Sequence, residues 1–286
     1  MNLTTPVAIP PSPLRLAHNR PVLLLGSCFS DEVGAKLIAA GFDVLCNPFG
    51  TLYNPESIAA CLSRAVANQP ITDQYLVCHE GLWHSWLHHG RFSHGQKAEA
   101  LAMANEAIGN THLFLQRHPV VIITFGTAWT FTLTQHGVGE AMVGQVVANC
   151  HKLPAAYFHR SRLSVGDIVS RWQPLLRQLG TDVLFTVSPI RHMADGAHGS
   201  QLSKATLLLA VDELMSPQCE YFPSYEIVMD ELRDYRFYAR DLCHVSDVAV
   251  DVVWERFQQT YMDAATLELC KKNEKSWRQS QHRPLH

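Results

Sequence analysis

Pro21-Val22-Leu23-Leu24-Leu25-Gly26-Ser27-Cys28-Phe29 is the stretch of sequence that decides the fold. The apolar run before Gly26 has the length and composition of a buried strand, and the segment 31–40 has a helical pattern. In a parallel α/β sheet, such a strand-turn-helix puts Ser27 and Cys28 at the carboxyl edge, where these sheets bind ligands. A turn of small residues chosen for close packing has the same pattern, so both interpretations stay open here.

Short apolar runs and helical patterns alternate along the rest of the chain. Strands are expected at 42–45, 120–125 and 183–188, and helices at 54–67, 97–117 and 165–179. This alternation indicates right-handed βαβ units. We therefore predict an α/β protein, a three-layer α/β/α sandwich with a parallel central sheet. A single domain is expected over 1–286, with a core at about 15–262 and a loosely ordered tail from 271 to 286.

Three segments depart from this alternation. The segments 74–92 and 130–147 are rich in aromatic, β-branched and glycine residues, which indicates hairpin insertions that could wall a pocket. The segment 220–230 is interpreted as an irregular strand.

Composition limits the classes of function. The chain has 286 residues, of which 47% are hydrophobic, and its 23 Lys and Arg nearly balance 26 Asp and Glu. This balance, with no long run of one charge, argues against nucleic acid or an acidic membrane surface as partner. We find neither a signal-peptide pattern nor a stretch of membrane-spanning length, so a cytoplasmic protein with a small-molecule substrate is expected.

The cysteines and histidines do not indicate a metal or cofactor site. Eight cysteines are scattered without a CxxC pair, which is typical of reduced thiols. His84 and His88 would share a face only in a helix, whereas the local pattern alternates like a strand. We therefore expect no metal and no cofactor.

A second cluster lies near the end of the chain. Asp241 precedes His244 by three residues, and Ser246 or Asp247 is the expected N-cap of a helix over 248–261. At this spacing the Asp241 carboxylate could fix the tautomer of His244 and leave its other nitrogen free to act as a base. Together with Ser27 and Cys28, these residues outline a catalytic triad.

Six short blocks add a more specific pattern, and they are Gly26-Ser27-Cys28-Phe29, Asn47-Pro48-Phe49-Gly50-Thr51 with Tyr53-Asn54-Pro55, Gly126-Thr127-Ala128-Trp129, Asn149-Cys150-His151-Lys152-Leu153-Pro154, Ser188-Pro189-Ile190-Arg191-His192 and Tyr221-Phe222-Pro223-Ser224-Tyr225-Glu226. Over about 4–257 the chain resembles the GSCFA-domain family of bacterial proteins, which is grouped with the SGNH/GDSL-like hydrolases. Ser30 stands where the family name has alanine. The resemblance implies the sandwich fold expected above.

The resemblance implies a nucleophile but leaves two alignments open. In SGNH-type enzymes the signature is Gly-Asp-Ser, the serine is the nucleophile, and the histidine of Asp-x-x-His is the base. Aligning the glycines puts Cys28 in place of the serine, whereas aligning the hydroxyls makes Ser27 the nucleophile. We favour Cys28, because the strand-end glycine fixes the turn. A thiol at a helix N-terminus beside His244 is also expected to exist largely as thiolate.

The oxyanion donors are the weakest part of this resemblance. Gly50 corresponds to the second-block glycine and could supply an N–H, but Ala128 stands where the superfamily has an asparagine. Losing such a donor costs about a hundredfold in rate, so a replacement for that amide is expected, and Thr127 and Asn149 are the candidates. Asn149 and His151 could equally hold a turn, and His192, after a predicted strand, is a candidate pocket residue.

Two classes of function follow from this pattern. The first is acyl chemistry through a covalent acyl-enzyme on Cys28 or Ser27, either hydrolysis of an ester or thioester or transfer to another acceptor. Trp83, Trp86 and Trp129 could stack on a sugar, so an acylated glycan is one possible substrate. The second is a binding protein that has lost turnover, which Ala128 makes plausible. The sequence does not predict an oligomeric state.

Overall fold

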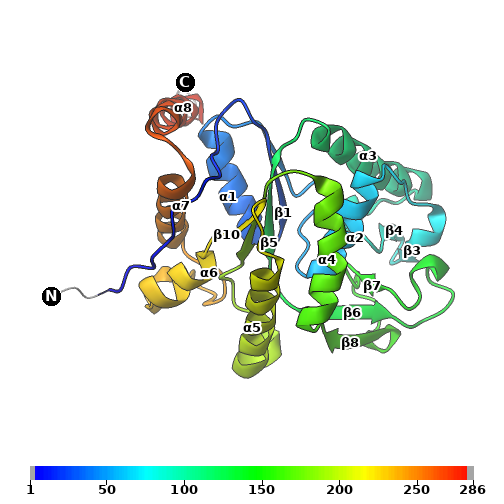
Figure 1. Cartoon of the computed structure of the whole chain (residues 1–286). Coiled ribbons are helices and arrows are strands. Elements are labelled where there is room, and N and C mark those ends of the chain that lie inside the picture. Colours follow the sequence, from blue (N-terminus) through cyan, green and yellow to red (C-terminus); the bar gives the residue numbers. More distant parts are fainter. Residues whose placement is uncertain (1–3, 282–286) are drawn as a thin grey trace, which may run out of the picture.

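Five strands form the central sheet of the computed structural model, which describes residues 4–281 (Figure 1). Their order across the sheet is β10-β9-β5-β1-β2, and all neighbouring pairs are parallel. The strands span Val22–Gly26 (β1), Val44–Cys46 (β2), Val120–Phe125 (β5), Val183–Val187 (β9) and Cys219–Tyr221 (β10). Every residue of β1, β5 and β9 is buried. Burial on both faces explains their continuous apolar runs.

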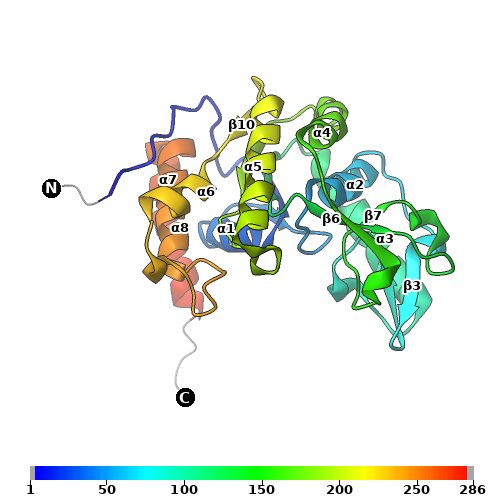
Figure 2. The same cartoon turned by 90° about the horizontal axis from the view of Figure 1, so that it is seen from below.

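Helices cover both faces of this sheet, which confirms the predicted α/β/α sandwich (Figures 1 and 2). The helices span Cys28–Ala39 (α1), Pro55–Val66 (α2), Lys97–Leu115 (α3), Val165–Leu179 (α4), Gly196–Leu214 (α5), Ser224–Glu226 (α6), Asp247–Tyr261 (α7) and Ala264–Gln281 (α8). Successive residues of β1 point to opposite faces, so Leu23 and Leu25 pack with α2, α3, α4 and α5, while Val22 and Leu24 pack with α1, α7 and α8.

Capping residues determine where several helices begin. Asn54 Oδ1 accepts the N–H of Ser57 (2.8 Å) and Pro55 occupies the first turn of α2, as the sequence predicts. Ser246, rather than Asp247, caps α7. The loop that carries Asp241 and His244 therefore ends at a fixed helix start.

Both hairpin insertions are confirmed. Strands β3 (Leu76–His79) and β4 (Leu82–Ser85) form an antiparallel pair, and β6 (Trp129–Leu133) pairs antiparallel with β7 (Val146–Val147). A third strand that the sequence did not predict, β8 (Phe158–Arg162), pairs with β6. In both views the insertions lie at the end of the molecule that also holds α3 (Figures 1 and 2).

Short helical turns connect these elements, and they span Asp73–Tyr75, Gly90–Phe92, Glu140–Met142, Ala155–Tyr157, Met193–Asp195, Ile227–Glu231 and Tyr235–Phe237. Within residues 4–281, no helix has both the length and the apolarity needed to cross a membrane.

Two expectations are wrong. The segment 220–230 is an irregular strand only at its start, because β10 ends at Tyr221 and helical turns follow from Ser224. The tail from 271 is helical up to Gln281 because it continues α8, which is held by the buried Cys270 and by Asn273 Nδ2, which donates to Ala40 O (3.0 Å); residues 282–286 lie outside the described residues.

Candidate active site

The turn between β1 and α1 is held in one conformation at the carboxyl edge of the sheet. Gly26 has a φ of +140°, and an added Cβ would lie 2.2 Å from the carbonyl oxygen of Thr124. The N–H of Gly26 donates to Asn47 Oδ1 (2.9 Å), and the N–H of Ser27 donates to Thr124 O (3.2 Å). Glycine is the residue that fits here, so the turn presents residues 27 and 28 in a fixed orientation.

The two candidate nucleophiles have different surroundings. Ser27 is 2% exposed, and its hydroxyl has no hydrogen-bond partner among residues 4–281. Cys28, the first residue of α1, is half-buried and lines a cavity. The thiol, and not the hydroxyl, therefore faces open space.

Asp241 holds His244 in the loop ahead of α7. Its Oδ2 accepts a hydrogen bond from His244 Nδ1 (2.6 Å), and its Oδ1 accepts the N–H groups of Cys243 (2.9 Å) and His244 (3.0 Å). These hydrogen bonds, that of the His244 ring foremost, lower the pKa of Asp241 to about 2. The proton of a neutral ring is thus held on Nδ1, and Nε2 is the basic nitrogen.

Cys28 and His244 line the same cavity, which has a volume of about 500 Å³. Part of its lining consists of residues that follow the sheet strands, and another part consists of Trp129 and Phe131 of β6 and Val147 of β7. The structure shows no hydrogen bond between the thiol and the His244 ring among the described residues. Such contacts often form only when substrate is bound. The structure thus brings Cys28 and His244, two members of the triad outlined from the sequence, to one cavity.

The expected resting thiolate is wrong. Burial raises the pKa of Cys28 above its ordinary value of 9.0, and the charges of Asp31 and Glu32 add to this effect. The N–H groups of Cys28 and Phe29, at the start of α1, lower the pKa but by less than burial raises it. Cys28 is therefore a neutral thiol at pH 7 and needs a base to become a nucleophile.

Gly50 is not in a position to be an oxyanion donor. Its N–H already donates to Asn47 O (2.8 Å), and the residue does not line the cavity. Its φ is +79°, and an added Cβ would lie 2.1 Å from Cβ of His89. Gly50 is needed for the turn that brings His89 to the cavity.

Thr127 and Asn149 both line the cavity, as expected. The hydroxyl of Thr127 is already bonded, because it pairs with Ser203 Oγ (3.1 Å) and accepts the N–H of Trp129 (3.1 Å). The Oδ1 of Asn149 accepts the N–H of His151 (2.8 Å), which leaves its amide N–H₂ group as a possible donor.

The two predicted histidines of the pocket differ in position. His151 lies outside the cavity lining, where its Nε2 donates to Ser85 O (2.8 Å) and its ring stacks on His84. Burial lowers its pKa to about 4, so it is a neutral structural side chain. His192 does line the cavity, and its Nε2 donates to Gly126 O (3.1 Å). Burial and the charge of Lys204 lower its pKa to about 4.

The remaining histidine and tryptophan candidates are mostly structural. His84 and His88 bond to Ser93 and Ser85, and among residues 4–281 no group of three His, Cys, Asp or Glu side chains could hold a metal ion. Trp86 is fully buried. Of the three tryptophans singled out from the sequence, Trp129 lines the cavity.

A family model described as the GSCFA family matches residues 21–257, more than four fifths of the chain. The chain belongs to the GSCFA family. The match begins at β1 and ends within α7, so Cys28, Asp241 and His244 all lie inside it. No curated protein matches this sequence.

Two further side chains of the GSCFA cavity were missed from the sequence. Tyr53 lines the cavity beside Cys28, and burial, then the charges of Cys28 and Asp31, raise its pKa. Asn54 lines it too, and because its Oδ1 caps α2, its amide N–H₂ remains as a donor. Both belong to the block Tyr53-Asn54-Pro55. Because Asn54-Pro55 is typical of a helix start, Asn54 was interpreted only as a cap, and its amide was not considered as a cavity donor.

Lys204 was also missed. It is 3% exposed, and its Nζ donates to Gly126 O (2.7 Å) and Ser188 O (2.6 Å), just beyond the ends of β5 and β9. No signal in the sequence could have found it, because its position depends on α5, which the strand and helix patterns did not show.

Proposed function

We propose that this GSCFA protein is an acyl hydrolase that cleaves an ester or thioester through a covalent intermediate on Cys28. The observation that carries the proposal is that Cys28 and His244, far apart in sequence, line one cavity, while Asp241 holds Nδ1 of His244 at 2.6 Å. A nucleophile, a base and a group that orients the base constitute the machinery of acyl transfer.

The reaction follows from these positions. Cys28 Sγ bonds to the substrate's carbonyl carbon as the thiol proton passes to His244 Nε2, and the carbonyl electron pair moves to oxygen. When this intermediate collapses, the bond to the alcohol or thiol breaks, and the leaving group takes the proton from Nε2. A water molecule then gives a proton to Nε2 as its oxygen bonds to the thioester carbon. When this second intermediate collapses, the C–S bond breaks and the proton on Nε2 returns to Sγ, which releases the carboxylic acid and restores the Cys28 thiol. Because Cys28 is neutral at rest, His244 acts as a base in the first step.

Two donors support a developing oxyanion. The first is the backbone N–H of Cys28 at the start of α1, and as the second we assign the amide of Asn54, which lines the cavity with Cys28. Leu52 N–H donates to Gly26 O (2.9 Å), and Tyr53 O accepts the N–H of Gly126 (2.8 Å), so the loop before Asn54 is joined to the nucleophile turn. Asn54 thus supplies the amide that Ala128 lacks.

Hydrolysis is favoured over transfer by the exposure of the base. The side chains of His244 and Asp241 are 52% and 51% exposed, so water reaches Nε2 readily. The order of the groups along the chain, a nucleophile after the first strand and Asp-x-x-His before a late helix, is similar to that of SGNH/GDSL-like hydrolases and supports this class.

Hydrolysis of p-nitrophenyl butyrate by the wild-type protein and by variants tests the proposal. We expect Cys28→Ala and His244→Ala to abolish turnover, and Ser27→Ala to retain it. Cys78→Ala is the matched control, because Cys78 is an exposed thiol of β3 outside the cavity. Turnover that survives in Cys28→Ala would exclude the proposed nucleophile. Acylation of Cys28 without hydrolysis, followed by capture of an added alcohol or amine, would favour an acyltransferase.

A further inference from the structure

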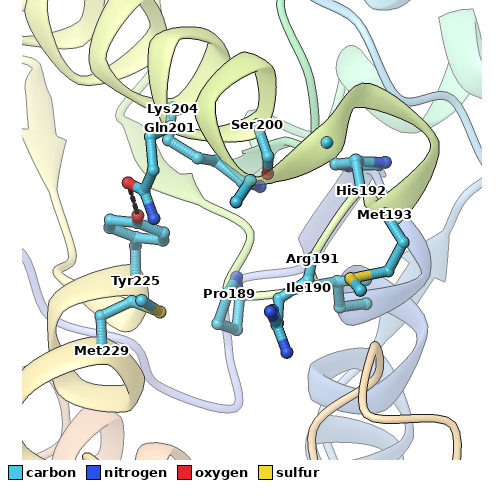
Figure 3. Close-up of a pocket in the computed structure, with 12 residues that line it drawn as sticks. Pro189, Ile190, Arg191, His192, Met193, Ser200, Gln201, Lys204, Tyr225 and Met229 are labelled. Atoms are coloured by element: carbon cyan, nitrogen blue, oxygen red, sulfur yellow. Dashed lines mark hydrogen bonds between the residues drawn. The ribbon is translucent and has the colours of Figure 1, made fainter.

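A small pocket of about 80 Å³ adjoins the catalytic cavity and shares Ile190, Arg191 and His192 with it. In Figure 3, Lys204, Gln201 and Ser200 extend from α5 on one side of the pocket, and Pro189 and Arg191 come from the segment after β9. Tyr225 and Met229 close one end. The volume is that of a small functional group and not of a whole substrate.

Lys204 gives this pocket an unusual charge. It is 3% exposed, and among residues 4–281 no carboxylate forms an ion pair with its Nζ. Two of its three N–H groups donate to carbonyl oxygens, which carry no full charge. A buried ammonium without a counter-ion is costly, and an anion in the pocket would offset that cost.

The surrounding charges do not supply this anion. Asp195 is the carboxylate whose charge acts on Lys204, but its side chain is 6% exposed and already paired with Arg160. No Asp or Glu lines either the small pocket or the catalytic cavity among the described residues, whereas Arg191 lines both. The shared walls are therefore net positive.

We propose that the substrate of this site is an acyl ester or thioester whose acyl chain ends in a carboxylate, and that this carboxylate binds in the pocket beside Lys204. The inference rests on the proposed function for the reaction at Cys28. A carboxylate suits the pocket better than a phosphate, because Lys204 has one N–H left to donate and Arg191 Nη1 already donates to Leu242 O (3.0 Å).

The pH dependence of binding follows from the groups around Lys204. Burial lowers the pKa of Lys204 to about 7, and Asp195, Cys243 and Cys28 partly oppose this shift. His192 and Tyr225 also face it, the latter with its ring centre 5.9 Å from Nζ, and both are neutral at pH 7. Lys204 loses its proton as the pH rises, so carboxylate binding should weaken between about pH 7 and pH 9.

Two measurements test the pocket independently of each other. Calorimetric titration with glutarate and with uncharged glutaramide measures binding without requiring catalysis, and we expect glutarate to bind about tenfold or more tightly. Hydrolysis of mono-p-nitrophenyl glutarate and of p-nitrophenyl butyrate then compares kcat/KM, with the same preference expected. In Lys204→Met this preference should fall to about one, even if the absolute rates also fall because Nζ no longer supports the strand ends.

The outcomes separate the two proposals. If both esters are hydrolysed equally and glutarate does not bind, the carboxylate pocket is refuted and the acyl hydrolase remains. If glutarate binds in a Lys204-dependent way but neither ester is cleaved, the pocket stands and the hydrolase fails. Tighter binding of methyl phosphate than of glutarate would overturn the assignment to a carboxylate. If Lys204→Met does not fold, the wild-type preference at pH 7 and at pH 9 decides, and an unchanged preference would contradict the role of Lys204.

Discussion

Asp241→Asn is the substitution that probes the proposed base, His244, most selectively. The asparagine retains an oxygen for the backbone N–H groups of Cys243 and His244, so the loop should keep its conformation. What changes is the 2.6 Å contact with His244 Nδ1, where an amide N–H₂ can replace the carboxylate oxygen. The ring is then held with its proton on Nε2, which cannot act as a base.

The expected loss follows from the geometry of the pair. A hydrogen bond to a charged group that orients a catalytic side chain is expected to change the rate by roughly 10- to 150-fold. The loss of rate should be far smaller than in a buried triad, because the His244 side chain is 52% exposed and its ring can rotate out of the hydrogen bond with the amide. We therefore expect kcat/KM for p-nitrophenyl butyrate to fall by about 10- to 150-fold while the melting temperature stays nearly constant.

The matched control is Asp247→Asn. It removes the same charge three residues beyond His244, from the exposed first turn of α7, with no bond to the ring. We expect its kcat/KM to stay within about twofold of wild type, since surface substitutions of this kind have small effects. Equal activities for Asp241→Asn and Asp247→Asn would refute the claim that Asp241 orients the base.

Three further predictions concern the oxyanion donor, the nucleophile turn and acid stability. Asn54→Asp keeps the oxygen that caps α2 but removes the amide donor, so kcat should fall about a hundredfold with little change in melting temperature. Asn149→Asp should lower kcat less, and the reverse order of the two kcat values would assign the donor to Asn149. Gly26→Ala should strongly lower the urea midpoint of unfolding, because the added Cβ would clash with Thr124 O. Gly109→Ala in α3, where the added Cβ meets open space, should be neutral or stabilising. Comparable midpoints for the two variants would contradict the tight turn at Gly26. Burial lowers the pKa of His88 to about 3 and that of His151 to about 4. Below pH 6.5 the unfolded chain therefore binds more protons than the folded chain, and the free energy of unfolding should decrease as the pH falls from 6.5 to 4. A urea midpoint that is equal at pH 7.5 and pH 5 would contradict the burial of these two neutral rings.

The central sheet and its carboxyl edge were predictable because strands buried on both faces are recognisable in a sequence as apolar runs. Strands β1, β5 and β9 are buried on both faces and therefore read as apolar runs, and the Asn54-Pro55 start of α2 follows ordinary capping chemistry. Strand topology placed Cys28 at the carboxyl edge, whereas the association of His244 with it came from the Asp241-x-x-His244 spacing and the family resemblance, because His244 lies in a loop ahead of α7 and follows no strand of the sheet. In contrast, the segment that becomes α5 begins with Gly, Ala and His and has no clear apolar period, so the helix and Lys204 were missed.

The parts of the site that failed were those decided by tertiary contacts. A helix N-terminus suggested a thiolate at Cys28, but burial outweighs the two N–H groups, and only the packed structure shows that balance. Gly50 was expected to be an oxyanion donor because it corresponds to the second-block glycine of the superfamily, yet its N–H is bonded within its own turn. His151 looked functional by residue type, whereas its ring belongs to the packing beneath the insertions.

Peptide-mapped mass spectrometry of the protein after brief exposure to an activated acyl ester tests the central claim most directly. The account predicts one acyl group, attached to Cys28, that is absent from Cys28→Ala and that forms more slowly in Asp241→Asn. Acylation of Ser27, or an adduct that forms unchanged in Cys28→Ala, would contradict the account.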